Sequence, residues 1–427
     1  MKSFENNDVR DRYFYLDTAA STRMTIEVYT RLTNIIHNED LFFGNPSSLH
    51  SAGRRMKSTM LYYINKMCDS YNQIIKYKNP NKDFKTITNG NFIFTSGGSE
   101  SNNLAVKGIA KYLFKTKNKN HIITSQIEHP SILNTCKQLE TEGFEVTYLS
   151  CDKNGKINLN ELERSIKDNT ALVSVMYVNN ETGTENDIKS IFKMCVDNDV
   201  YFHTDAVQSK NAPLFTELPL YCHSFSLSGH KFGAMQGIGL LYISNDLKLE
   251  PQIVGGHQQN GLRAGTENVF GILSIILALE LKLSSYIRLM SRLSHGKPVT
   301  KRSDEENYIK VLINYIIESK ITDYTIITPK ECFHNGILNI AFDNVEGESL
   351  VLAMDKENIY ISNGSACNAG SIKPSHVLTA MGYSDKVAKN SVRISFDDRI
   401  CLKDDDLEYI TNTLVKCVNN IRRINGD

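Results

Sequence analysis

The chain has 427 residues, of which 41% are hydrophobic and 22% are charged, as is ordinary for a globular protein. Its 48 Lys and Arg residues balance its 48 Asp and Glu residues, so we expect neither nucleic acid nor a membrane surface as a partner. The longest apolar run, residues 270–283, is too short to span a bilayer and contains Glu280, which predicts a core helix.

The first ninety residues predict one strand, one long helix and an exposed excursion. Residues 13–16 form a short apolar run that predicts a strand. A helix is expected to begin near His50, with Ser47 or Ser48 able to cap it. Residues 71–90 are rich in Asn and Lys, and we expect them to be exposed.

A strand, a glycine pair and the start of a helix follow one another from residue 92. Residues 92–95 predict a buried strand, and a helical pattern covers 104–113. Between them lie Gly98 and Ser99 in a Ser-Gly-Gly-Ser sequence. Free N–H groups and the positive end of a helix dipole suit a phosphate at such a place. The same residue types also cap ordinary helices, so this motif predicts a phosphate site only in combination with the other motifs of the chain.

Short apolar runs alternate with helical patterns through the next 120 residues. The predicted buried strands are residues 122–124, 146–149, 171–178, 200–204, 224–227 and 239–243, with helices at 159–166 and 188–196. This alternation predicts an α/β fold with a mostly parallel sheet covered by helices on both faces. Residues 284–305 are polar and predict an exposed connection, after which strands and helices resume from Tyr308.

Two strand ends carry an acid and an amine. Asp205 and Lys231 each lie just after an apolar run, and the carboxyl ends of parallel strands share one edge of the sheet. Pyridoxal 5'-phosphate (PLP) needs this pair: its aldehyde forms an imine with a lysine, and its ring nitrogen stays protonated beside an acid. Ser228 and His230 flank the lysine and could hold the phosphate. Taken singly, such an Asp is usually a cap and such a Lys is usually solvated.

Three further candidates lie on loops. His129 could stack on a flat cofactor ring and exchange protons, although a histidine at a helix start more often makes one ordinary hydrogen bond. Asn180 follows a predicted strand and could donate to a phenolate oxygen of the ring. Cys367 lies in a small, polar, glycine-bounded stretch, residues 361–371, from which a thiolate could reach solvent and attack.

The other cysteines lie mostly in apolar or helical settings, where a buried and inert thiol is the default. The nine Cys show neither CxxC pairs nor the spacing of metal ligands, so no metal site is predicted. The odd number of thiols, and acidic residues at the N-terminus in place of a secretory apolar region, predict a cytoplasmic protein with reduced thiols.

Together these motifs resemble the PLP-dependent cysteine desulfurases of the NifS/IscS kind, within the class V aminotransferase family. The matching stretches are residues 94–103, 180–183, 226–231, 255–257, 263–268, 364–367 and 391–395. The resemblance as a whole extends from about Tyr15 to about Ser395, so it covers nearly the whole chain.

The resemblance implies the fold type I of PLP-dependent transferases. It divides the chain into four parts. Residues 1–16 are an N-terminal segment that joins the small domain, and residues 17–283 are a large PLP-binding domain. Residues 284–305 are an exposed connection, and residues 306–427 are a small α+β domain carrying Cys367 and Arg393. It also implies a homodimer with shared active sites, in which Thr266 reaches the phosphate bound by the other subunit.

It further assigns a role to each candidate. Lys231 holds PLP, Asp205 faces its ring nitrogen, and His129 stacks on its ring. The remaining cofactor contacts are Asn180 and Gln208 at the phenolate oxygen, and Gly98, Ser99, Ser228, His230 and Thr266 at the phosphate. Arg393, with Asn180, binds the substrate, and the arginine suits a bidentate contact with a carboxylate.

The implied reaction removes sulfur from L-cysteine, leaving L-alanine and a persulfide on Cys367. The persulfide then passes to an acceptor protein, such as an iron–sulfur scaffold or a thiolation partner. Three alternatives share part of the motif set: a selenocysteine lyase, a class V transaminase that would not need Cys367, and a scaffold without catalysis. Departures from the family pattern at 233–235, 259–260 and 397–398 bear on turnover and partner choice more than on cofactor binding.

Overall fold

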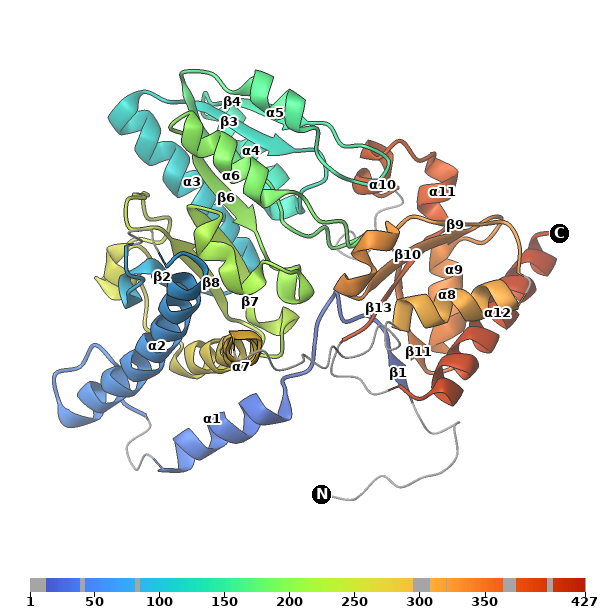
Figure 1. Cartoon of the computed structure of the whole chain (residues 1–427), viewed down its shortest axis with the longest axis horizontal. Helices are drawn as coiled ribbons and strands as arrows, with labels where there is room; N and C mark the ends of the chain where they lie inside the picture. Colours follow the sequence, from blue (N-terminus) through green and yellow to red (C-terminus); the bar gives the residue numbers. More distant parts are fainter. Residues whose placement is uncertain are drawn as a thin grey trace.

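The structure is a computed structural model that describes residues 13–38, 43–80, 85–294, 308–319, 321–363, 374–397 and 402–426. Two layered bodies lie side by side, and the N-terminal segment runs from the smaller body to the larger one (Figure 1). Cys367 lies outside the described residues, as do residues 295–307, which belong to the predicted connection.

The larger body is built on a seven-stranded sheet of order β2-β8-β7-β6-β5-β3-β4. Its strands are β2 (Phe92–Thr95), β3 (His121–Ser125), β4 (Glu145–Leu149), β5 (Thr170–Ser174), β6 (Tyr201–Asp205), β7 (Ser224–Ser228) and β8 (Gly239–Ile243). Neighbouring strands from β4 to β7 are parallel, whereas β8 runs antiparallel to both of its neighbours. The prediction of a mostly parallel sheet is confirmed.

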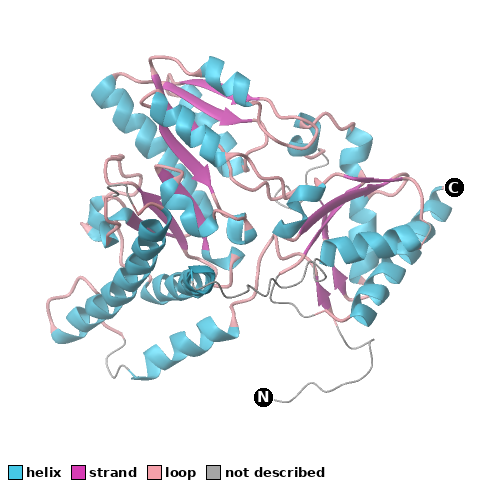
Figure 2. Ribbon diagram, in the orientation of Figure 1, coloured by secondary structure: helices cyan, strands magenta, loops and turns pink. Residues whose placement is uncertain are grey.

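Helices cover both faces of this sheet (Figure 2). They are α1 (Ile26–Asn38), α2 (Ser51–Lys78), α3 (Gly98–Lys117), α4 (Pro130–Thr141), α5 (Leu159–Ser165), α6 (Ile188–Asp197) and α7 (Val269–Ser294). Adjacent residues of one strand enter different cores, because successive side chains point to opposite faces. Ile122 packs in the core with Leu104 of α3, whereas Ile123 packs in the core with Leu273 of α7. The continuous apolar runs of the sequence therefore reflect burial on both faces.

The long helix α2 differs from the prediction. It extends to Lys78, and Tyr71, Ile74 and Ile75 are buried in it, so the expectation that residues 71–90 are an exposed excursion is wrong for this part. These three side chains stand at helical spacing among Asn and Lys residues, whose polarity hid the pattern. The helix is capped by His50, whose Nδ1 accepts from the N–H of Gly53, and not by Ser47 or Ser48.

Helix α7 is a core helix, as predicted, but it is longer than the predicted run. It has 26 residues and is long and apolar enough to cross a membrane by length and composition. However, 61% of its most apolar window is buried inside the structure, and α7 packs along α2. Its last turns also occupy the first part of the stretch that was expected to be an exposed connection.

The smaller body holds an antiparallel sheet of order β12-β13-β10-β9. These strands are β9 (Tyr324–Ile326), β10 (Ile337–Phe342), β12 (Ser362–Asn363) and β13 (Ser391–Ser395), and the helices are α8 (Tyr308–Glu318), α9 (Gly347–Asp355), α10 (His376–Ala380), α11 (Asp385–Lys389) and α12 (Asp404–Asn425). Strand β1 (Phe14–Tyr15) pairs in parallel with β11 (Ile359–Tyr360). Phe14 and Leu16 are buried in the core of the smaller body, which anchors the N-terminal segment there.

Candidate active site

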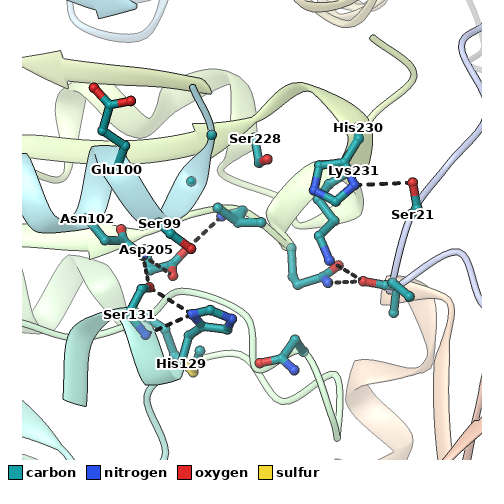
Figure 3. A pocket seen from close by; sticks show the side chains of 18 of the residues that line it. Ser21, Ser99, Glu100, Asn102, His129, Ser131, Asp205, Ser228, His230 and Lys231 are labelled. Carbon is teal, nitrogen blue, oxygen red and sulfur yellow. Dashed lines mark hydrogen bonds between the residues drawn. The ribbon is translucent and has the colours of Figure 1, made fainter. Parts of the chain in front are cut away.

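A cavity of about 650 Å³ opens where β6 and β7 end (Figure 3). Most of the predicted site residues line it: Gly98, Ser99, His129, Asn180, Asp205, Gln208, Ser228, His230, Lys231 and Arg393. Thr266 is exposed and is not part of this lining. The cavity thus collects residues from both bodies and from the N-terminal segment.

Asp205 and Lys231 face this cavity from opposite sides (Figure 3). Asp205 is the last residue of β6 and is 5% exposed. Its two carboxylate oxygens accept hydrogen bonds from the backbone N–H of Val207 at 3.0 Å and from Nδ2 of Asn102 at 2.7 Å. The Nζ of Lys231 donates to the carbonyl oxygen of Ala19 at 2.6 Å. One wall therefore carries a held carboxylate, and the other carries an amine.

The start of α3 forms a third wall. No side chain caps this end of the helix, so its first N–H groups and the positive end of its dipole face the cavity. A Cβ added at Gly98 would lie 2.8 Å from Cγ2 of Val207 and 3.3 Å from Cβ of Ser228, so only glycine lets these segments approach. The sequence motif of strand, glycines and helix start therefore builds a cradle of the kind that binds phosphate.

Two histidines border the cavity, and burial lowers the pKa of both. Burial lowers the pKa of His129 and outweighs the opposing charge of Asp205. Its Nδ1 accepts from the N–H of Ser131 at 3.1 Å. Burial and the charge of Lys231 lower the pKa of His230 to about 4.

Arg393 enters the cavity from β13 of the smaller body and is 2% exposed. Its NH2 donates to Oδ1 of Asp17 at 2.8 Å, and its NH1 donates to the carbonyl oxygen of Asn180 at 2.9 Å. Within the described part of the chain, its buried Nε has no hydrogen-bond partner. The guanidinium is therefore held in place while one donor remains unsatisfied.

Sequence reasoning missed two residues that hold the site. Asp17 directly follows the first predicted strand, and this position at a strand end is the feature of the sequence that could have identified it as a site residue. Asn102 stands inside the quoted motif 94–103, but nothing in the sequence showed that its side chain reaches Asp205, 103 positions away.

The three departures from the family pattern lie around the cavity, and none of the residues described for them belongs to its lining. The N–H of Gly233 donates to Oγ1 of Thr22 at 2.9 Å. The Oε1 of Gln259 accepts from the N–H of Phe94 at 3.0 Å. Asp397 forms a buried ion pair with Lys210 at 3.4 Å. Asp398 lies outside the described residues.

The residues present fit PLP by their chemistry. The amine of Lys231 can hold an aldehyde, the carboxylate of Asp205 can face a protonated ring nitrogen, and the uncapped start of α3 can bind a phosphate. The cavity is also large enough for a ligand of that size.

Comparison with known proteins agrees with this geometry. Residues 14–404 match the family described as Aminotransferase class-V. A cysteine desulfurase IscS from Dictyoglomus turgidum is 36% identical over 413 residues, covering 97% of this chain and 96% of that protein. A solved structure titled NifS-like protein aligns with a TM-score of 0.77 at 28% identity, covering 96% of this chain and 100% of that one. A structure of SspA in complex with cysteine aligns with a TM-score of 0.69 at 31% identity, covering 90% and 98%.

The chain belongs to the class-V aminotransferase family, whose members depend on PLP, and it has their fold type I. Within that family it belongs to the cysteine desulfurases, in agreement with the resemblance seen in the sequence.

Proposed function

We propose that this enzyme binds PLP in the cavity and removes sulfur from L-cysteine, giving L-alanine and a persulfide on Cys367. The observation that carries the proposal is the opposition of Lys231 and Asp205 across one cavity (Figure 3). When bound, PLP supplies an electron sink that weakens the bonds at Cα of an amino acid. The relatives named cysteine desulfurase and the neighbour solved with cysteine support this substrate.

Each wall of the cavity has a task in this proposal. Lys231 would hold the cofactor through Nζ, Asp205 would accept the ring N–H, and His129 would lie against the ring. Asn180 and Gln208 would contact the phenolate oxygen. The phosphate would be held by Gly98, Ser99, Ser228 and His230. Gln208 is fixed for this task, because its Nε2 donates to the carbonyl oxygen of Ala19 at 2.6 Å.

Arg393 would bind the substrate carboxylate, with Asn180 beside it. The guanidinium already has NH1 and NH2 engaged, so its orientation is set before substrate arrives. The Nζ of Lys231 then takes the proton from Cα of L-cysteine, since no other amine lines the cavity among the described residues.

Cys367 would act as the nucleophile. Its thiolate attacks the substrate sulfur, so that an S–S bond forms and the Cβ–S bond breaks with its electron pair left on carbon. Protonation of Cβ, together with return to Cα of the proton held by Lys231, would give alanine. Cys367 is assigned from its motif, but the described neighbours support the assignment: Ser362, on the strand that leads into this loop, pairs directly with Arg393 in the sheet.

We also propose a cytoplasmic homodimer that passes the persulfide sulfur to an acceptor protein. Thr266 supports the shared site because it is exposed and lies outside the lining of this chain's own cavity. The division into 1–16, 17–283, 284–305 and 306–427 remains part of the proposal, and the separate seven-stranded and four-stranded sheets support a large and a small domain, although α7 continues to Ser294, past the bound at 283.

The test is to purify the protein, record its visible spectrum, and measure alanine and sulfide from L-cysteine with and without reductant. Cys367→Ser should keep the cofactor band and lose persulfide formation. Full desulfuration by that variant would refute the nucleophile. Faster turnover of selenocysteine would favour the lyase, amino transfer to pyruvate would favour the transaminase, and the lack of a cofactor band would favour the scaffold.

A further inference from the structure

Asn102 lies on α3 with 1% of its surface exposed and borders the cavity beside Asp205. We propose that Asn102 is a positioning residue that sets both Asp205 and His129 through the two N–H groups of one side-chain amide. The inference rests on the proposed function, because it concerns the carboxylate and the imidazole that would face PLP.

The two hydrogen bonds of the amide nitrogen diverge. Nδ2 of Asn102 donates to Oδ2 of Asp205 at 2.7 Å and to Oγ of Ser131 at 2.9 Å (Figure 3). With the amide turned over, its oxygen would stand against the carboxylate of Asp205, so charge fixes which end faces the acid. A single nitrogen thus supplies both donors.

The oxygen end of the same amide faces the imidazole of His203. Oδ1 of Asn102 lies 3.4 Å from Nε2 of His203. His203 is fully buried, and burial lowers its pKa to about 3, so its ring is neutral. Nδ1 of His203 lies 2.5 Å from Oγ of Ser224, and Nε2 also lies 3.4 Å from Oγ of Ser226; with the ring proton on Nε2, His203 can donate to Oδ1 of Asn102. A buried histidine that the reaction does not use therefore has a role in orienting the amide.

The second N–H of the Asn102 amide connects it to His129 through Ser131. Ser131 accepts from Asn102 at Oγ, so its own hydroxyl proton is directed to Nδ1 of His129, 2.7 Å away. The backbone N–H of Ser131 also donates to that nitrogen at 3.1 Å. Two donors at Nδ1 leave the ring proton on Nε2. With the ring proton of His203 on Nε2, the side-chain hydrogen bonds from His203 through Asn102 and Ser131 to His129 all have one direction.

The test compares Asn102→Asp with Asn103→Asp in full-length enzyme. Asn102→Asp keeps the size of the side chain but replaces both N–H donors with an oxygen facing Asp205. Asn103 is the next residue of α3, and its Nδ2 donates to the carbonyl oxygen of Ser99 away from Asp205, so Asn103→Asp is a matched control for a new charge on this helix. We expect Asn102→Asp to weaken PLP binding at least tenfold, to change the visible circular dichroism of the bound cofactor, and to lower kcat more than it changes KM for cysteine. We expect the control to weaken PLP binding less than Asn102→Asp does and to leave the visible circular dichroism unchanged, because Asp205 and Ser131 keep their bonds to Asn102.

Ser131→Ala keeps the proposal testable if Asn102→Asp fails to fold, which far-ultraviolet circular dichroism would show. This variant removes only the hydroxyl between Asn102 and His129. We expect it to lower kcat severalfold with PLP binding nearly unchanged, and to have little further effect when added to Asn102→Ala.

Near-normal PLP binding and visible dichroism in folded Asn102→Asp, or full additivity of Ser131→Ala with Asn102→Ala, would overturn the inference. If the unaltered enzyme itself shows neither a cofactor band nor alanine formation, the proposed function has failed instead. The two failures are therefore distinguishable.

Discussion

Arg393 and Asp17 form a partly buried ion pair across 376 positions of the chain, with NH2 of the arginine 2.8 Å from Oδ1 of the aspartate. One residue lies on β13 and the other just after β1, so the N-terminal segment is joined to the proposed substrate site. The arginine therefore has a carboxylate partner within the chain itself.

Asp17→Asn should lower KM for L-cysteine. Asparagine keeps an oxygen that can hold NH2 of Arg393, but it removes a negative charge that repels the carboxylate of the substrate. At about 1 kcal/mol for such a charge pair, the expected decrease in KM is roughly fivefold. Steady-state kinetics measure this.

Arg393→Lys is the matched variant, and it should raise KM at least tenfold because a lysine cannot form the bidentate contact. A higher KM for Asp17→Asn would show that the charge of Asp17 is needed to orient the arginine.

Gly98→Ala should weaken PLP binding at least tenfold. The new Cβ would lie 2.8 Å from Cγ2 of Val207, which is a stiff side chain, so the start of α3 must shift. Gly97→Ala is the control, because a Cβ there meets nothing within 4 Å and its backbone is extended. Equilibrium titration of both variants with PLP tests this. Equal losses for the two variants would contradict the role of close packing at Gly98.

Local patterns were sufficient to predict the sheet and the two main residues of the site. Buried parallel strands require continuous apolar runs, and their carboxyl ends share one edge of the sheet, so the sequence alone predicts that Asp205 and Lys231 lie close together. The motif 94–103 likewise predicted an anion site at a helix start, although α3 begins at Gly98, six residues before the expected helix.

The unpredicted features depend on packing between distant segments. Ile74 and Ile75 appear in a polar stretch, and only the fold shows that α7 covers this helix. Asn102 and Asp17 bond partners 103 and 376 positions away, and no local pattern encodes such distances. The Lys210–Asp397 pair likewise joins a turn of the larger body to the end of β13.

Asp397→Asn should destabilise the protein. Asp397 and Lys210 are both buried, at 4% and 8% exposed, so the variant removes a buried negative charge from beside a buried lysine. Loss of one partner of a buried pair costs about 3–5 kcal/mol of unfolding free energy. Denaturant unfolding measures the change, and a decrease below about 1 kcal/mol would contradict it. The double variant Lys210→Met, Asp397→Asn should recover part of the loss, because it removes both buried charges of the pair together.

Glu128→Gln should remove a pH dependence of stability. Burial raises the pKa of Glu128 to about 8, and the nearby charge of Asp205 acts in the same direction, whereas hydrogen bonds from the N–H of Met176 and the hydroxyl of Ser125 oppose the shift. In the unfolded chain the same carboxyl titrates near 4.5. Between these values the folded protein holds a proton that the unfolded chain has released, so this group makes stability fall as pH rises, by up to about 1.4 kcal/mol per pH unit.

The contribution of Glu128 is therefore fully favourable below about pH 4.5, decreases up to about pH 8, and is constant above that. Glutamine keeps an oxygen at the position that accepts from Met176 at 2.8 Å and Ser125 at 2.7 Å, and it cannot titrate. We expect the variant to gain stability relative to the unaltered protein as pH rises from 5 to 8. Denaturant unfolding at several pH values, with the difference between the two proteins plotted against pH, measures this slope. A flat difference would show that Glu128 is ionised in the folded protein over the whole range, and that its buried carboxylate is stabilised by its two donors alone.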